Sequence, residues 1–118
     1  MKINILGTEY GFCVKSYDSE PYFKENSVSG YCDGVLKQIV LCEPATLPDM
    51  ENETPEFCAA YQREVMRHEI VHAYLNESGL ADSSLQIGLA WARNEEMVDW
   101  IALQGPKIYK TWQEAGAL

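Results

Sequence analysis

The stretch that decides the fold runs from Thr54 to Gly79 and reads TPEFCAAYQREVMRHEIVHAYLNESG. Thr54 followed by Pro55 is a typical helix start, because threonine caps free N–H groups and proline suits the first helical position. Apolar residues then recur at three- and four-residue steps, which predicts a helix to about Ser78, and Gly79 is suited to end it. The face expected to be buried carries Phe57, Tyr61, Val65, His68, Val71, His72 and Leu75.

Residues 68–72 of this helix read His-Glu-Ile-Val-His and contain both histidines of the chain. Helical positions four apart share a face, so the two imidazoles can bind one metal ion with Glu69 beside its open side. The pattern H-E-x-x-H therefore indicates a zinc site that activates water, with Glu69 as general base. The alternative is an ordinary helix whose histidines are solvated or packed in a core.

A catalytic zinc site normally has three protein ligands, and no third histidine is present, so the third must be a carboxylate or a thiolate. A second helix is expected over residues 94–104. Glu95 is the candidate ligand on it, and Asp99, one turn later, is placed to contact the outer nitrogen of a ligating histidine. Glu96 should point away from this face. The alternative for Glu95 and Asp99 is a solvated acidic helix start. The residues that share the face are Glu95, Val98, Asp99 and Ala102.

The fold class expected for the chain is α+β, in one domain with a β-rich part over residues 1–42 and a helical part over residues 54–115. Short β-prone runs bounded by turn residues predict a small N-terminal antiparallel sheet. Its expected strands are Lys2–Leu6, Tyr10–Lys15, Tyr31–Asp33 and Gln38–Cys42.

The other segments are expected to be connections or short helices. Residues 16–29 and 43–54 read as loops, because they are polar and rich in turn residues. Gly105-Pro106 should end the second helix, with a last short helix over residues 107–115. Residues 85–91 fit a short helix and an extended segment equally well.

Composition excludes several classes of protein. The net charge of −9, from nine basic and 18 acidic residues, argues against a nucleic-acid binder. No apolar run is long enough to cross a bilayer, and residues 1–7 are too short for a signal peptide, so a cytoplasmic protein without membrane contact is expected. The four cysteines lack any C-x-x-C pair, which favours free thiols over a disulfide scaffold or zinc ribbon. They are Cys13, Cys32, Cys42 and Cys58.

Together, residues 68–72 and Asn94-Glu95-Glu96-Met97-Val98-Asp99 resemble the signature of the gluzincin metallopeptidases, the thermolysin-like group. Members carry H-E-x-x-H on one helix and N-E-x-x-x-D on the next. The segment from Glu95 to Pro106 is also similar to the ImmA/IrrE-type peptidases. Residues 67–73 and the Gly-Tyr-Cys-Asp segment at 30–33 resemble small phage-encoded metallopeptidase-like proteins.

The resemblance implies a single minimal zincin-like domain that is a phage-related zinc metallopeptidase acting on a peptide or protein. It implies one Zn²⁺ per chain, with Glu69 as general base, Asp99 orienting a histidine, and the ligands His68, His72 and Glu95. It further implies that a sheet-edge strand pairs with extended substrate, here expected to be Gln38, Ile39, Val40, Leu41 and Cys42.

The residue that stabilises the oxyanion and the biological role each have more than one candidate. Larger relatives stabilise the oxyanion with an additional histidine and a tyrosine, and here Tyr61, Tyr74, Tyr109 or Arg93 could substitute. One alternative function is a catalytically weak or inactive zinc-binding interaction module. Another is a phage or mobile-element regulator that cleaves a repressor. The sequence does not specify the substrate or the oligomeric state.

Overall fold

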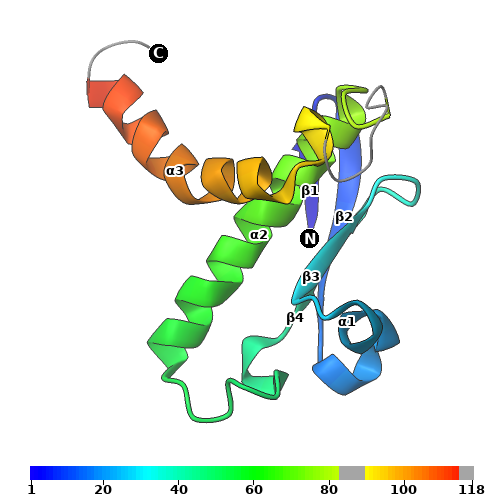
Figure 1. The fold of residues 1–118 in the computed structure, drawn as a ribbon, viewed down its shortest axis with the longest axis vertical. Helices are drawn as coiled ribbons and strands as arrows, with labels where there is room; N and C mark the ends of the chain where they lie inside the picture. The colour runs from blue at the N-terminus through cyan, green and yellow to red at the C-terminus, as the bar shows by residue number, and fades with distance from the viewer. Residues whose placement is uncertain (83–89, 115–118) are drawn as a thin grey trace.

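The computed structural model describes residues 1–82 and 90–114, with side chains described up to residue 110. It has the α+β fold that the sequence predicts: a four-stranded sheet from the N-terminal part, followed by two long helices (Figure 1). None of the described helices is both long enough and apolar enough to cross a membrane.

The sheet is mixed, with strand order β1-β2-β4-β3. β1 pairs with β2 and β3 pairs with β4 in antiparallel register, whereas β2 and β4 are parallel. The predicted antiparallel sheet is thus right for the two hairpins and wrong for the central pair. After β2 the chain crosses one face of the sheet and enters the hairpin formed by β3 and β4. This hairpin joins the sheet through β4, which lies beside β2, and β3 is left at the edge. The strands are Lys2–Ile5 (β1), Thr8–Lys15 (β2), Gly30–Asp33 (β3) and Gln38–Cys42 (β4).

The crossover between β2 and β3 contains a helix where the sequence predicts only loop. A 3-10 turn, η1 (Tyr17–Ser19), is followed by the α-helix α1 (Pro21–Asn26). With six residues α1 is too short to carry a periodic apolar pattern, so periodicity could not reveal it. Its anchor is Phe23, which is fully buried. The other predicted loop, residues 43–54, contains the 3-10 turn η2 (Pro44–Thr46).

β4 is buried on both faces because the sheet has a core on each side. Ile39 and Leu41 pack toward the long helix α2, in a core with Ala73. Val40 and Cys42 pack on the opposite face, in a core with Phe23, Leu47 and Met50. All four cysteines are free thiols, as the sequence predicts.

α2 (Pro55–Glu77) has the predicted limits: the Thr54 hydroxyl accepts a hydrogen bond from the Phe57 backbone N–H at 3.2 Å, and Gly79 adopts a positive φ of 79°. The predicted buried face needs correction. Phe57 is 48% exposed, and the most buried residues are Glu69, Ala73 and Leu75. One side of α2 packs on the sheet and another side packs on α3. Its buried surface is therefore wider than the predicted stripe, and its centre lies near Glu69 and Ala73.

α3 (Glu95–Glu114) is continuous, so the predicted break at Gly105-Pro106 is wrong. Pro106 removes one backbone hydrogen bond and bends a helix, but it does not have to end one. Figure 1 accordingly shows α3 changing direction along its length. The predicted helix over residues 107–115 corresponds to its second half as far as Glu114, and residue 115 lies outside the described part. Of residues 85–91, only Ala90 and Trp91 are described: Ala90 precedes the 3-10 turn η3 (Trp91–Arg93), which Trp91 begins, and residues 85–89 lie outside the described part.

A candidate metal centre between α2 and α3

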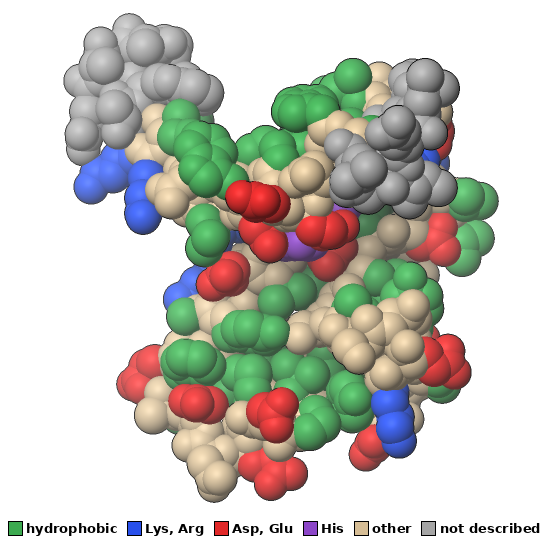
Figure 2. Space-filling model, viewed as in Figure 1, with side chains coloured by type: hydrophobic (Ala, Val, Ile, Leu, Met, Phe, Trp, Pro, Cys, Tyr) green, Lys and Arg blue, Asp and Glu red, His purple; other side chains and the backbone are tan. Residues whose placement is uncertain are grey.

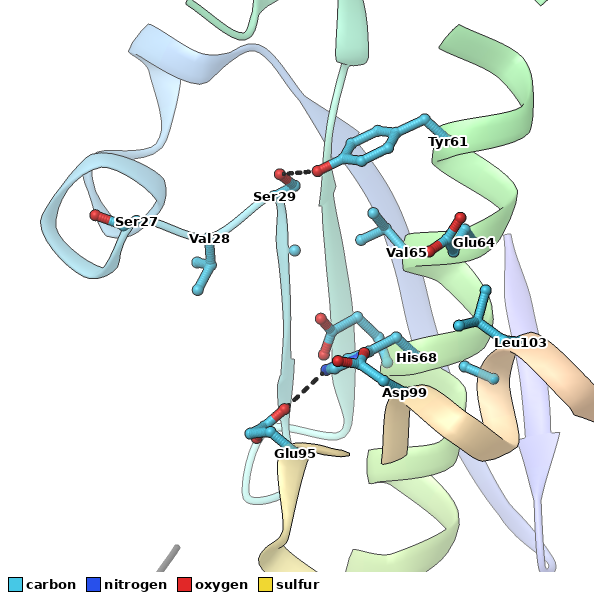
Figure 3. A pocket seen from close by; sticks show the side chains of 13 residues that line it. Ser27, Val28, Ser29, Tyr61, Glu64, Val65, His68, Glu95, Asp99 and Leu103 are labelled. Atoms are coloured by element: carbon cyan, nitrogen blue, oxygen red, sulfur yellow. Dashed lines mark hydrogen bonds and ion pairs between the residues drawn. The ribbon is translucent and has the colours of Figure 1, made fainter. Parts of the chain in front are cut away.

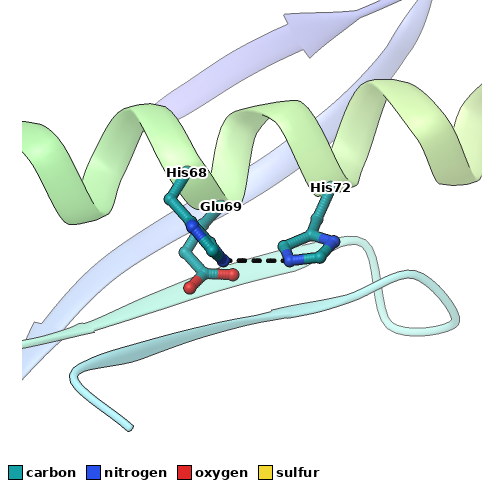
Figure 4. Close-up of side chains that lie close together, drawn as sticks. All are labelled: His68, Glu69 and His72. Carbon is teal, nitrogen blue, oxygen red and sulfur yellow. Dashed lines mark hydrogen bonds between the residues drawn. The ribbon is translucent and has the colours of Figure 1, made fainter. Parts of the chain in front are cut away.

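The two histidines of α2 turn their Nε2 atoms toward each other. His68 Nε2 lies 3.0 Å from His72 Nε2, and the rings meet edge to face (Figure 4). A carboxylate oxygen of Glu69 and one nitrogen from each histidine all lie within 4.8 Å of one another. The helix spacing therefore groups three potential metal-binding side chains on one side of α2.

The start of α3 brings Glu95 to the same point. Glu95 Oε2 lies 3.2 Å from His68 Nε2, and its Oε1 lies 3.4 Å from His72 Nε2. The Asn94 side chain accepts a hydrogen bond from the Met97 backbone N–H at 2.9 Å, which caps the helix turn that carries Glu95.

Two contacts further along α3 hold it against α2. Val98 is fully buried in a core with Leu75, Ala81 and Ala92. Arg67 donates from Nε to the Ala102 carbonyl oxygen at 2.8 Å. The backbone at Glu95 is therefore positioned by packing and hydrogen bonds that do not involve the carboxylate itself.

The donor set fits zinc in chemistry and in spacing. The two imidazole nitrogens and the Glu95 carboxylate are separated by 3.0 to 3.4 Å. Donors bound tetrahedrally to Zn²⁺ at about 2.0–2.1 Å would lie about 3.3 Å apart. His68, His72 and Glu95 could thus hold Zn²⁺ with little rearrangement.

Asp99 lies behind His68 in this arrangement. Its Oδ1 is 2.6 Å from His68 Nδ1, the nitrogen on the far side of the ring from Nε2. An ionised carboxylate can only accept hydrogen bonds, so Nδ1 is the donor. A neutral His68 then carries its lone pair on Nε2, which is the form that binds a metal.

Glu69 has an environment unlike that of a surface carboxylate. It is only 6% exposed, and this burial raises its pKa to about 7, with a further rise from the nearby charges of Glu95 and Asp99 and an opposing effect of His68. A carboxylate whose pKa lies near neutrality can both accept and return a proton under physiological conditions. Burial also lowers the pKa of His72, which favours its neutral, metal-binding form.

The centre lies between two cavities that share part of their lining. One has a volume of about 420 Å³ and extends toward Tyr61 (Figure 3); the other has a volume of about 450 Å³ and extends toward Arg93. We call them the Tyr61 cavity and the Arg93 cavity. Together they form a cleft on both sides of the centre. The residues that line both are Val28, Gly30, His68, Glu69 and Glu95.

The edge strand that lines this cleft is β3, so the prediction that Gln38–Cys42 forms the sheet edge is wrong. β4 (Gln38, Ile39, Val40, Leu41 and Cys42) pairs with β2 on one side and β3 on the other, and cannot be an edge. The Cys42 backbone N–H donates a hydrogen bond to the Ser29 carbonyl at 2.8 Å. This bond determines which residues of β3 direct their backbone N–H and C=O groups toward β4 and which direct them outward, since the two kinds alternate along the strand. In that alternation the backbone groups of Gly30 and Cys32 point away from β4.

Of the four candidates for oxyanion stabilisation, two lie beside the metal centre and two lie away from it. Tyr61 and Arg93 line the cavities named after them. The Tyr61 hydroxyl is 2.8 Å from the Ser29 hydroxyl, and Arg93 donates from Nε to the Ala81 carbonyl at 2.7 Å. Tyr74 and Tyr109 instead line an apolar groove between α2 and α3 that borders none of the candidate metal-site residues.

Among the residues of the Arg93 cavity that the sequence did not identify as site residues are Tyr31, Cys32 and Asn76. Burial raises the pKa of the Cys32 thiol to about 12, so it is protonated at neutral pH. The spacing of Asn76, four residues after His72 on the same helix, is the signal that could have found it. Nothing in the spacing of β3 relates Tyr31 or Cys32 to the histidines.

Comparisons of the chain with protein-family models, with curated proteins and with solved structures give no match. The resemblance to zinc peptidases is therefore a resemblance of two sequence motifs, and the geometry around them bears on a candidate metal site.

Proposed function

We propose that the protein is a zinc-dependent peptidase of the gluzincin type. The observation that supports this most directly is the spacing of 3.0 to 3.4 Å among His68 Nε2, His72 Nε2 and the Glu95 carboxylate, with Glu69 beside them in an open cleft. The proposal assigns His68, His72 and Glu95 to one Zn²⁺. It assigns Asp99 to holding His68 in its metal-binding tautomer.

A bound Zn²⁺ would act as a Lewis acid that acidifies water and polarises a carbonyl group. Glu69 would accept the proton of the attacking water at its carboxylate and later donate it to the leaving amine. Its pKa is about 7 in the metal-free protein, and the charge of a bound Zn²⁺ would lower that value and favour the ionised form that accepts the proton.

The peptide would lie extended along β3, bonded to the outward backbone groups of Gly30 and Cys32. Arg93 would supply the positive charge for the oxyanion. It is the only Lys or Arg among the residues that line either cavity in the described part of the chain.

A second function, a zinc-binding interaction module without activity, is supported by the position of the centre. Glu95 on α3 meets the histidines of α2, so zinc would tie the two helices together and stabilise the domain whether or not catalysis occurs. A more specific form of the peptidase proposal is a cytoplasmic enzyme whose substrate is a repressor protein.

The substitution Glu69→Gln separates peptidase from interaction module, because it removes the base and keeps the size of the side chain. The peptidase proposal expects cleavage of an unfolded protein substrate to fall by about 10²–10⁴-fold. Zinc content, measured by elemental analysis, and the melting temperature should change little. Glu96→Gln is the control, since it makes the same charge change on an exposed neighbour of Glu95.

Activity that survives Glu69→Gln at the wild-type level would contradict the proposed mechanism. A wild-type protein with one zinc per chain and no cleavage of any peptide would support the interaction module instead.

A further inference from the structure

The Tyr61 cavity combines apolar walls with a negative rim. Val28, Val65, Ala102 and Leu103 supply aliphatic surface. Four carboxylates also line it, with no Lys or Arg among the described lining residues: Glu64, Glu69, Glu95 and Asp99. In Figure 2 the Asp and Glu side chains gather around the histidine on the face that is shown. A cavity of this kind suits a ligand group with an apolar stem and a cationic end.

Glu64 differs from the other three carboxylates because it has no role in the centre. Glu95 and Asp99 contact the histidines, and Glu69 is buried beside them. Glu64 is exposed and has no hydrogen-bond or ion-pair partner among the described residues. It is therefore free to pair with a charge that a ligand brings.

The position of Glu64 matches the reach of a substrate side chain. It lies four residues before His68 on α2, which is about 6 Å along the helix axis. Val65 and Leu103 lie on the same side of the cavity in Figure 3, so a stem leading from the centre to Glu64 would contact aliphatic groups. A lysine or arginine side chain extends about this far from the backbone that carries it.

The two ends of the cleft differ in charge. Both cavities are lined by Glu69 and Glu95. The Arg93 cavity adds the Arg93 guanidinium, which lies 3.8 Å from an Asp82 carboxylate oxygen, whereas the Tyr61 cavity adds Glu64 and Asp99, with no Lys or Arg among its described lining residues. A cationic side chain would thus be attracted more strongly to the Tyr61 end of the cleft than to the Arg93 end.

We propose that the Tyr61 cavity is a specificity pocket for a lysine or arginine side chain of the substrate peptide, with Glu64 as the residue that selects the charge. The proposal rests on the peptidase function and names its substrate class: peptides with a basic residue at one fixed position relative to the cleaved bond.

Binding to the zinc-loaded Glu69→Gln variant tests the pocket without turnover. The probes are two fluorescent, unstructured peptides that are identical except for lysine or norleucine at a central position, with affinity measured by anisotropy. We expect the lysine peptide to bind about tenfold more tightly, as for a charge-assisted contact in a partly exposed site. Adding Glu64→Gln should remove this preference. Adding Glu56→Gln, at an exposed α2 position outside both cavities, should preserve it.

Charge reversal and cleavage sites provide a second measurement. Glu64→Lys should favour a peptide with glutamate at the central position, an outcome that loss of folding cannot produce. Mass spectrometry of a peptide mixture cut by the wild type should show Lys or Arg enriched at one position beside the cleaved bonds.

Equal affinity for the lysine and norleucine peptides, or a preference that Glu64→Gln leaves unchanged, would overturn the pocket assignment. Cleavage without a basic preference would do the same and leave the peptidase function standing. A zinc-loaded wild type that cuts no peptide would refute the peptidase function and the specificity with it.

Discussion

A Cβ atom added to Gly30 of β3 would lie 2.8 Å from Cγ1 of Val65 on α2. It would also lie 3.0 Å from Leu41 Cδ2 and 3.2 Å from the Val40 carbonyl oxygen. Because Gly30 lines both cavities, the absence of a side chain there lets the edge strand approach the metal-site helix. The width of the cleft depends on this contact.

Gly30→Ala should destabilise the protein by about 1–3 kcal/mol, since the new methyl group must displace packed neighbours. Urea unfolding measures the change. Gly11→Ala is the control: a Cβ there would lie 3.9 Å from its nearest neighbours, Gln38 Cγ and the Lys37 carbonyl oxygen, and alanine within a strand should stabilise by about 0.5–1 kcal/mol. A Gly30→Ala protein as stable as the wild type would mean that β3 and α2 are not this close.

Glu95→Gln should weaken zinc binding by more than about 100-fold. Loss of a residue that only supports a metal ligand lowers affinity by about 10–100-fold, so the loss of a ligand itself should exceed that range. Its matched control is Glu96→Gln, which changes the same charge one residue away and should leave the affinity unchanged. Competition with a chelating dye measures both. Equal affinities for the two variants would remove Glu95 from the ligand set.

Asp99→Ala should lower zinc affinity by about 10–100-fold, because His68 loses the acceptor that fixes its tautomer. The melting temperature of the zinc-free protein should change little, since the Asp99 side chain is 61% exposed. Nitrogen NMR of the His68 ring would report the tautomer directly. An unaltered tautomer in the variant would contradict this role.

Zinc binding should move the ring hydrogen of His72 from Nε2 to Nδ1. His68 Nδ1 donates to Asp99, so in neutral rings the hydrogen between the two Nε2 atoms, which lie 3.0 Å apart, belongs to His72 when no metal is bound. Zinc needs the Nε2 lone pair of His72, and a neutral imidazole then carries its one hydrogen on Nδ1. Nitrogen NMR of the His72 ring measures the tautomer, and a hydrogen that stays on Nε2 in the zinc-loaded protein would remove His72 from the ligand set.

Glu77 should make stability depend on pH in the acid range. Its carboxylate bonds to Lys37 and Thr8, and to the Tyr10 hydroxyl at 2.8 Å, and these bonds, that of Lys37 most, lower its pKa from 4.5 to about 2. A depressed pKa in the folded state contributes stability that is fully present above pH 4.5 and is lost as the pH falls toward 2. Glu77→Gln should flatten this part of a curve of unfolding free energy against pH. A curve with unchanged slope would show that the bonds do not persist in solution.

Several features of the fold could be predicted because they depend on neighbouring residues alone. Thr54 and Gly79 mark the ends of α2 through capping and backbone conformation, and residues 68–72 share a side through helical spacing. The β3–β4 hairpin likewise depends on residues close together in the chain. The position of β4 inside the sheet could also have been recognised, because Ile39 to Cys42 is apolar at every position, which is typical of a strand buried on both faces.

The tertiary structure decided the rest. Whether β3 or β4 lies at the sheet edge depends on where α1 delivers the chain, and α1 is held by the burial of Phe23 rather than by its own pattern.

The sequence by itself determined that two histidines and a glutamate share one side of a helix, because a 3.6-residue repeat leaves no other arrangement. Only the tertiary structure decided that Glu95 meets those histidines and that an open cleft passes over them. Both depend on the packing of Val98 against α2 and on the close approach of Gly30, which are contacts between residues far apart in the chain.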